Sequence, residues 1–277
     1  MKRIAVLMTC YNRVGTTLEC LRRLFSQKVP EGYSLDVWLV DDASPDKTGE
    51  KVKAAYPHVN VIRGTGKLFW CRGMRLAWDK AAEAHDYDFY LWLNDDVMLF
   101  DGAIGSLLRD AERLGDDKVL VGAFSDDESG ESISYSAGSA EGTDIVPNGR
   151  TPQEGHGYFG GNMVLVPRKV FLQVGPICSF YHHGFGDFDY ALQLTRKEIG
   201  FYVASIVCGW CGKSAKKKIP LRTLPLRKRI GLAFARNGFN VFDSFVFHFR
   251  NHGIVRAVLS VCHIFYRIVM SRGFLLR

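Results

Sequence analysis

The chain has 277 residues, of which 47% are hydrophobic and 23% are charged. This balance is typical of a folded domain with a buried core, and it excludes a chain that is mainly disordered, collagen-like or of low complexity. The net charge of +7 is unevenly distributed, because the segment from Lys213 to Arg277 holds 14 basic residues and one acidic residue, Asp243. That segment carries +13, whereas the first 212 residues, with 22 basic and 28 acidic side chains, carry −6. The sequence therefore describes an acidic body with a basic tail.

The cysteines and the apolar runs bear on the compartment. Seven cysteines at irregular spacing do not indicate a disulfide framework, so we expect a reducing cytosol. Cys208 and Cys211 have the spacing of a redox dithiol, but they close the body instead of opening a helix, which favours buried thiols without a redox role. The first apolar run, residues 4–8, is too short for a signal peptide, and no run reaches the roughly 18 residues of a membrane span. We expect a cytoplasmic protein, either soluble or lying on a membrane surface.

Short apolar runs alternate with helical patterns over the first 125 residues. Strands are predicted over residues 4–8, 35–40, 59–62, 88–93 and 119–124. Helices are predicted from Thr16, over about 70–85 and over about 102–114. The first of these helices is expected to begin with a capping box, because Thr16 and Glu19 have that spacing.

The pattern changes after Ser125. Residues 125–157 are rich in Ser, Gly, Asp and Glu, which indicates loops, and they are followed by a strand over 163–166, a helix after Asp187 and a last strand over 200–207. Strands that alternate with helices indicate an α/β fold with a doubly wound, mostly parallel sheet. We expect one domain over residues 1–212 and a helical basic tail over 213–277.

Polar residues follow three of the predicted strands, at Thr9–Arg13, Asp41–Asp46 and Asn94–Asp96. Ligands of an open parallel sheet bind beyond the carboxyl ends of its strands. Asp and Asn also serve ordinary turns, but two acidic pairs at two such turns favour a site. Carboxylates at a strand end suit Mg²⁺ or Mn²⁺ with positions left open for a diphosphate. The phosphate loop and the dinucleotide fingerprint are both missing, which argues against an ATPase or a dehydrogenase.

A third acidic group, Asp187 and Asp189, precedes a helical stripe. Asp187 is the stronger candidate for a functional role, because Gly184 and Gly186 are expected to leave room for a substrate. For Asp189, plain helix capping is as good an explanation as contact with a substrate.

These segments, in this order, resemble the inverting glycosyltransferases of family 2, which have the GT-A fold. The resemblance covers about residues 3 to 212. The segments that carry it are Val6–Arg13, Val40–Asp46, Leu93–Val97, Gly160–Arg168 and Gly186–Tyr190. The last of them, together with Gly66–Trp70, is most similar to the rhamnosyltransferase-like branch. The resemblance implies a GT-A-like sheet flanked by helices, with the basic helical extension after it.

The resemblance also implies roles for individual residues. The donor nucleotide would be held by Thr9, Tyr11, Arg13, Asp41 and Asp42, with the Tyr11 ring packing on the base. From the residues alone, Arg13 is a candidate for a phosphate contact or for an ion pair.

The metal, Mg²⁺ or Mn²⁺, would be bound by Asp96 with Asp95 beside it and Asn94 as a further ligand. Asn94 stands where many members of the family carry Asp. Asp187 would be the general base that takes the proton from the acceptor hydroxyl.

Weaker candidates for contact with the substrate are Trp70, Asn162, His183 and Asp189. Core packing is the alternative for Trp70, and a structural hydrogen bond is the alternative for His183 and its neighbour His182.

The tail has a helical pattern of its own. Arg256, Ser260, His263 and Arg267 form one narrow polar stripe on an otherwise apolar helix. Such a helix suits an anionic membrane surface, to which Lys213–Lys218 and Leu226–Arg229 would add electrostatic attraction. The alternative is that the tail packs on the body or on a second copy in a homodimer. Nucleic acid is not expected, because the acidic body would repel phosphate.

Together these features predict a metal-dependent inverting glycosyltransferase on the inner face of the cell membrane. The resemblance suggests a dTDP- or UDP-sugar donor, with rhamnose as the first choice, and a glycan or lipid-linked acceptor in bacterial surface polysaccharide synthesis. A sugar-phosphate nucleotidyltransferase and a non-catalytic nucleotide-sugar-binding protein are the alternatives.

Overall fold

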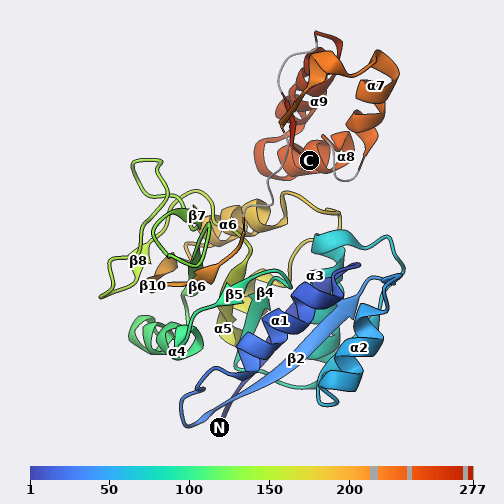
Figure 1. Cartoon of the computed structure of the whole chain (residues 1–277). Helices are drawn as coiled ribbons and strands as arrows, with labels where there is room; N and C mark the ends of the chain where they lie inside the picture. The colour runs from blue at the N-terminus through green and yellow to red at the C-terminus, as the bar shows by residue number, and fades with distance from the viewer. Residues whose placement is uncertain (213–217, 236–238, 271–273, 277) are drawn as a thin grey trace.

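A computed structural model describes residues 1–212, 218–235, 239–270 and 274–276. Within these residues a ten-stranded sheet has the order β3-β2-β1-β4-β9-β6-β10-β5, with β7 paired to β6 and β8 to β10 (Figure 1). Its strands are β1 (Lys2–Cys10), β2 (Tyr33–Asp41), β3 (Asn60–Arg63), β4 (Phe89–Leu93), β5 (Met98–Leu99), β6 (Val119–Ser125), β7 (Ile133–Tyr135), β8 (Gln153–Glu154), β9 (Met163–Pro167) and β10 (Phe201–Trp210). The central pairs β1–β2, β2–β3, β1–β4 and β6–β10 are parallel, whereas β9 runs antiparallel to β4 and β6. The predicted mostly parallel α/β sheet is confirmed.

Helices cover both faces of the sheet. The alternation of β1 sends Ile4, Val6 and Met8 to one face and Ala5 and Leu7 to the other, and all five are buried. The first face packs against α1 (Val14–Phe25), α2 (Thr48–Ala55) and α4 (Ala103–Leu114), and the second against α3 (Phe69–Ala84), α5 (Arg168–Val174) and α6 (Gly186–Arg196). The body is thus a three-layer, doubly wound α/β/α fold.

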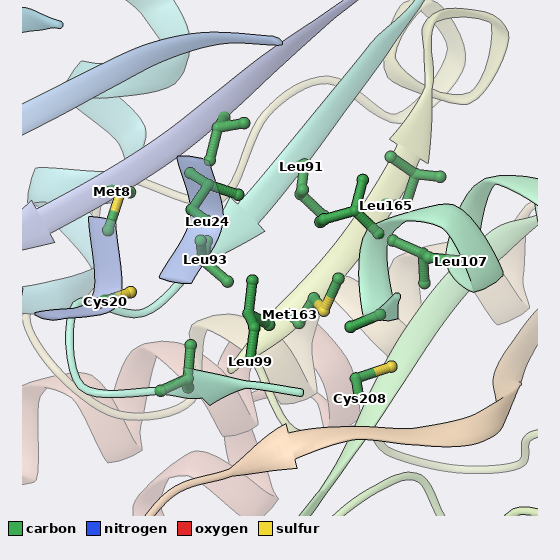
Figure 2. Close-up of a cluster of buried hydrophobic side chains, with 14 of the residues drawn as sticks. Met8, Cys20, Leu24, Leu91, Leu93, Leu99, Leu107, Met163, Leu165 and Cys208 are labelled. Carbon is green, nitrogen blue, oxygen red and sulfur yellow. The ribbon is translucent and has the colours of Figure 1, made fainter. Parts of the chain in front are cut away.

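The first of these layers is shown in Figure 2, where leucines of β4, β9, α1 and α4 meet. Leu91 and Leu93 come from β4, Leu165 from β9, Leu24 from α1 and Leu107 from α4, and all five are almost fully buried. Burying each such side chain stabilises the fold by about 1.5–3 kcal/mol. This packing holds the ends of β1 and β4, and the polar residues that follow them, in fixed positions.

The start of α1 differs from the expectation. The helix begins at Val14 and has no side-chain cap, so Thr16 lies inside its first turn. The Glu19 carboxylate does not reach back to the backbone, because it accepts hydrogen bonds from Arg22 and Arg23 at 2.7 and 2.8 Å. The predicted capping box is therefore wrong. The short elements α2, α5 and β5 were not predicted either.

The described part of the tail forms three α-helices, α7 (Leu226–Phe234), α8 (Val241–His252) and α9 (Ile254–Val269), which gather beyond α6 (Figure 1). A short 3-10 helix (Leu221–Thr223) precedes them, and β11 (Lys218–Pro220) pairs antiparallel with β12 (Phe274–Leu276). In the part of the chain that the structure covers, we find no helix with the length and apolar content that a membrane crossing requires.

The tail is joined to the body through α8. Asp243, the one acidic residue of the tail, accepts a hydrogen bond from the His182 backbone N–H at 2.8 Å and lies 2.9 Å from His182 Nδ1. Asn251 and Arg250 reach the Asp189 carboxylate at 2.7 and 3.4 Å. The loop before α6 is therefore held from the tail side.

Candidate active site

A cleft of about 490 Å³ lies at the carboxyl ends of β1 and β4. Ten of the residues singled out in the sequence line it: Thr9, Tyr11, Arg13, Asp42, Trp70, Asn94, Asp95, Asp96, Asn162 and His183. The prediction that the strand ends would meet at one edge is confirmed. Tyr11 keeps 54% of its surface exposed, so the ring is available to a ligand in the cleft.

The neighbouring residues Asp41 and Asp42 separate. The Asp41 carboxylate accepts hydrogen bonds from the backbone N–H groups of Ser44 (3.0 Å) and Gly49 (3.1 Å) and faces a different cavity, beside α2. A Cβ at Gly49 would lie 2.6 Å from Asp41 Oδ2, so only glycine allows this close approach. The structure does not bring Asp41 to the cleft; Asp41 holds the loop that leads into α2.

Asp42 shapes the wall of the cleft. Its buried carboxylate accepts hydrogen bonds from the backbone N–H groups of Gly66 (2.7 Å), Leu68 (2.9 Å) and Phe69 (3.1 Å). Hydrogen bonds from three donors stabilise a buried carboxylate. Phe69 has a left-handed φ of 58°, so Asp42 also holds the strained entry to α3.

The acidic pair after β4 converges on one positive group. The Arg13 Nη1 atom lies 2.6 Å from Asp96 Oδ2 and 3.2 Å from Asp95 Oδ1. Thr17 Oγ1 donates to Asp95 Oδ2 at 3.1 Å. Burial raises the pKa of Asp95 to about 7, although Arg13 opposes this shift. The carboxylates of Asp95 and Asp96, with the Arg13 guanidinium beside them, therefore form the acidic end of the cleft.

This donor set fits a divalent cation. Carboxylate oxygens from two adjacent residues already share one positive charge, and hard cations such as Mg²⁺ and Mn²⁺ prefer such oxygens. Among the residues that the structure covers, no group of three or more His, Cys, Asp or Glu side chains is arranged to hold a metal. Oxygens of the substrate and of water would complete the ligand set of a cation at Asp95 and Asp96.

Two residues that the sequence does not assign to the site contact the acidic pair. Thr17 lies one turn inside α1, and no motif marks it. Cys211 directly follows β10, and its Sγ is 3.9 Å from Asp96 Oδ1. Burial raises the pKa of Cys211 to about 12, and the negative charge of Asp96 acts in the same direction. Cys211 is therefore a protonated thiol at neutral pH. Cys208 is also buried, as expected, and both cysteines are free.

Asn94 connects the acidic end to the opposite wall. Its Oδ1 accepts a hydrogen bond from Trp70 Nε1 at 2.6 Å, and its Nδ2 donates to Asn162 Oδ1 at 2.7 Å. The Asn94 backbone N–H donates to the Asn162 carbonyl at 2.9 Å. The carbonyl oxygen of the Asn94 side chain, expected as a metal ligand, is thus already engaged by the indole.

Asp187 lies in the first turn of α6, next to this wall. Its Oδ2 accepts a hydrogen bond from the Gly161 N–H at 3.1 Å and its Oδ1 from the Phe188 N–H at 3.0 Å. Burial raises the pKa of Asp187 against these hydrogen bonds. Because Asn162 follows Gly161 and lines the cleft, the Asp187 carboxylate is held at the edge of the same site.

The two glycines before Asp187 differ. A Cβ at Gly184 would meet nothing within 4 Å, so that position is open as expected. A Cβ at Gly186 would lie 2.7 Å from Cys71 Sγ and 2.9 Å from Ile177 Cδ1. The expectation that Gly186 leaves room for a substrate is wrong; it permits close packing of α6 on the body.

The histidines and Asp189 also separate. His183 lines the cleft, whereas His182 is held by Asp243. Asp189 is buried away from the cleft, where it accepts hydrogen bonds from Tyr181 Oη at 3.0 Å and from Asn251. Asp189 therefore neither caps α6 nor faces the cleft; it anchors the tail.

A doubly wound α/β/α body with an acidic pair after β4, and a further carboxylate beside the wall of the cleft, is the arrangement of a glycosyltransferase of the GT-A type. Residues 5–175, more than half of the chain, match the model of Glycosyl transferase family 2, and the chain belongs to this family. No curated protein matches the sequence.

Solved structures share the fold at low sequence identity. The mannosyltransferase PcManGT from Pyrobaculum calidifontis, in complex with GDP-Man and Mn2+, is 14% identical; the match has a TM-score of 0.58 and covers 98% of this chain and 76% of that chain. S. aureus TarS 1-349 in complex with UDP-GlcNAc is 13% identical, with a TM-score of 0.57 and coverage of 98% and 81%. GalNAc-T7 with UDP, GalNAc and Mn2+ is 14% identical, with a TM-score of 0.57 and coverage of 77% and 46%.

Proposed function

We propose that this glycosyltransferase moves a sugar from a nucleoside diphosphate to a hydroxyl of a glycan or lipid-linked acceptor, with inversion at the anomeric carbon. The observation that carries the proposal is that Asp95 and Asp96 line one cleft, while Asp187 is hydrogen-bonded to Gly161, next to the lining residue Asn162. A dTDP- or UDP-sugar is the proposed donor, with rhamnose as the first sugar to test, in bacterial surface polysaccharide synthesis. The nucleotide sugars named in the similar structures support a donor of this class.

The donor would lie along the cleft from Tyr11 to Asn162. The exposed Tyr11 ring suits stacking on the nucleobase, with Thr9 beside it. The diphosphate would lie near Asp95 and Asp96, where a bound Mg²⁺ or Mn²⁺ would stabilise the negative charge that the leaving group gains. Arg13 would also contact the oxygens of the diphosphate, because its guanidinium already lies beside both carboxylates.

Asp187 would act as the general base. A sugar hydroxyl has a high pKa, so its oxygen becomes a nucleophile only as its proton leaves. The Asp187 carboxylate would accept that proton while the oxygen attacks the anomeric carbon and the diphosphate departs from the opposite side. Burial raises the pKa of Asp187 towards the working pH, which improves a carboxylate as a base. The N–H groups of Gly161 and Phe188 hold it in place.

A thermal-shift screen of dTDP, UDP, GDP and their sugars with Mn²⁺ tests the proposal. Stabilisation by a nucleoside diphosphate and release of free sugar from its nucleotide sugar would support it. Stabilisation by none would overturn it, and binding without donor cleavage or transfer would favour a non-catalytic binding protein. Release of pyrophosphate from a nucleoside triphosphate and a sugar phosphate would favour the nucleotidyltransferase.

We also propose that the tail docks on the cytoplasmic side of an anionic membrane. One side of α9 packs within the tail, where Ala257, Ile264 and Ile268 are buried and Ser260 Oγ lies 3.3 Å from Ser244 Oγ. The other side, with Met270 directly after the helix, leaves apolar residues exposed: Ile254, Val255, Val258, Leu259, Tyr266, Val269 and Met270. The helix thus packs on the other helices of the tail and still keeps an apolar outer face, which supports the proposal of a membrane surface.

Charge favours a membrane as the occupant of this outer face. The tail carries +13, and Arg227, Lys228 and Arg256 belong to its helices α7 and α9. Basic residues near an anionic surface contribute about 1 kcal/mol each. Lys213–Lys217, most of the first predicted basic cluster, lie outside the described residues.

Co-sedimentation with phosphatidylglycerol and phosphatidylcholine vesicles tests the docking. Leu259→Gln should weaken binding to the anionic vesicles by about 10- to 150-fold, since about 1.5–3 kcal/mol of apolar burial is lost. Leu172→Gln is the matched control, because Leu172 is exposed on α5 of the body (68%, against 55% for Leu259). Equal loss in both variants would contradict the proposal, as would a dimer in solution that Leu259→Gln dissociates.

A further inference from the structure

One chain of hydrogen bonds crosses the wall of the cleft from Trp70 through Asn94 to Asn162. The indole N–H can only donate, so the group of Asn94 that faces it must be the carbonyl oxygen. The Asn94 amide nitrogen then faces Asn162 and requires the carbonyl oxygen of that side chain. The donor-only indole therefore fixes the orientation of both amides, and the Asn162 Nδ2 group points away from Asn94.

The Asn162 Nδ2 group has no hydrogen-bond partner within the described part of the chain. Asn162 is only 6% exposed, and it is one of the residues that line the cleft. Buried polar groups are almost always hydrogen-bonded, so an unpaired amide donor at the wall of a cleft indicates a missing ligand. Its partner must be a hydrogen-bond acceptor.

The position of Asn162 identifies the part of the ligand. The preceding residue, Gly161, donates its N–H to Asp187, and the Asn162 backbone carbonyl accepts from Asn94, which directly precedes Asp95 and Asp96. The amide thus lies between the proposed base and the acidic pair. Under the proposed function, the sugar that is transferred occupies the space between the base and the diphosphate.

We infer that Asn162 Nδ2 donates a hydrogen bond to an oxygen of the transferred sugar, and that Trp70 and Asn94 are positioning residues that set this polarity. The inference rests on the proposed function. It also explains a departure from the family pattern: an Asp at position 94 has no N–H to donate. Asn162 would then have to turn its amide nitrogen towards position 94 and present its carbonyl oxygen to the cleft.

Calorimetric binding with Mn²⁺ present tests the inference without turnover. UDP-glucose and dTDP-rhamnose are the probes, each compared with its nucleoside diphosphate, so that the ratio of the two affinities gives the contribution of the sugar. Asn162→Ala should lower the affinity for the nucleotide sugar by about 2- to 12-fold, the effect of one hydrogen bond, and leave the nucleoside diphosphate unaffected. Asn148→Ala, in an exposed loop, is the matched control and should change neither affinity.

A double-mutant cycle separates the positioning role from a metal role. Asn94→Asp should lower the contribution of the sugar about as much as Asn162→Ala, and it should have no further effect when added to Asn162→Ala. If Asn162→Ala does not fold, the isosteric Asn162→Asp replaces it, because it removes the donor and keeps the acceptor for Asn94.

Three outcomes would overturn the inference. In the first, the contribution of the sugar to the affinity is unchanged in both Asn162→Ala and Asn94→Asp. This result would refute the inference and leave the proposed function standing, provided that the nucleoside diphosphates still bind. Additive effects in the cycle, with tighter Mn²⁺ binding by Asn94→Asp, would assign Asn94 to the metal instead. Absence of binding of any nucleoside diphosphate to the wild-type protein would overturn the proposed function together with the inference.

Discussion

Arg13 occupies the position where a divalent cation would bind, so its removal should change the affinity for metal. Its Nη1 atom lies 2.6 Å from Asp96 Oδ2 and 3.2 Å from Asp95 Oδ1. A metal that binds both carboxylates must displace this guanidinium. Arg13→Ala removes the competitor, and we expect Mn²⁺ to bind the nucleotide-free variant more tightly than the wild-type protein.

The size of the effect follows from burial. Half of the Arg13 side chain is exposed, as is about a third of Asp96, whereas Asp95 is buried. Exposed ion pairs are worth about 0–1 kcal/mol, and the buried partner places this pair at the top of that range. About 1 kcal/mol corresponds to a roughly fivefold gain in Mn²⁺ affinity. The same substitution should weaken the binding of UDP or dTDP, because the variant lacks the guanidinium that would contact the diphosphate.

Electron paramagnetic resonance of free Mn²⁺, at pH 8.5 and without nucleotide, measures this affinity. At this pH the proton competes weakly for Asp95, whose pKa is about 7. Arg63→Ala is the control, because it removes the same charge from an exposed residue on the wall of the second cavity. Unchanged Mn²⁺ affinity in Arg13→Ala, or an equal gain in Arg63→Ala, would refute the competition.

Further outcomes concern stability and pH. Gly73→Ala should destabilise the body by about 1–3 kcal/mol in urea unfolding, because its Cβ would overlap Thr9 Oγ1 across the contact between α3 and β1; wild-type stability would contradict this packing. Asp243→Ala should lower the free energy of unfolding by about 1–3 kcal/mol through the lost bonds to His182, and an unchanged value would show that this contact is weak. Burial raises the pKa of Asp187, so the ionised carboxylate costs folding free energy above that pKa; Asp187→Asn should raise Tm at pH 7, by an amount that shrinks as the pH falls through the raised pKa. A lower Tm for that variant at pH 7 would show that the carboxylate stabilises the fold instead.

The sequence was sufficient for the main strands of the sheet and for most of the cleft. Apolar runs bounded by polar turns locate β1, β2 and β4, and parallel strands bring their carboxyl ends to one edge, so Thr9, Asp42 and Asp96 could be placed together. Contacts within the site were harder to foresee. Asp41 and Asp42 are adjacent, but successive residues of an extended chain point to opposite sides, and only one of them reaches the cleft.

Other parts of the site depend on contacts between distant segments. Cys211 reaches Asp96 only because β10 pairs with β5, which follows the acidic pair in the chain. The partners of Asp189 come from α8, some 60 residues later in the chain, and no local pattern indicates that contact. The orientation of the Asn162 amide depends on its chain of hydrogen bonds with Asn94 and Trp70. In the sequence these two residues are separate candidates, one for the metal and one for the substrate, and nothing connects them.

The central claim is that Asp187 is the base of a sugar transfer in this cleft. Its most direct test compares Asp187→Asn with the wild-type protein in transfer from the nucleotide sugar that binds best, with nucleotide affinity measured on the same samples. Asp117→Asn is the control, because Asp117 is a half-buried aspartate at the amino end of β6 and thus at the opposite edge of the sheet. We predict that Asp187→Asn loses about 10²- to 10⁴-fold in turnover while it binds the nucleoside diphosphate and Mn²⁺ like the wild-type protein. Near-normal turnover in Asp187→Asn would contradict the assignment.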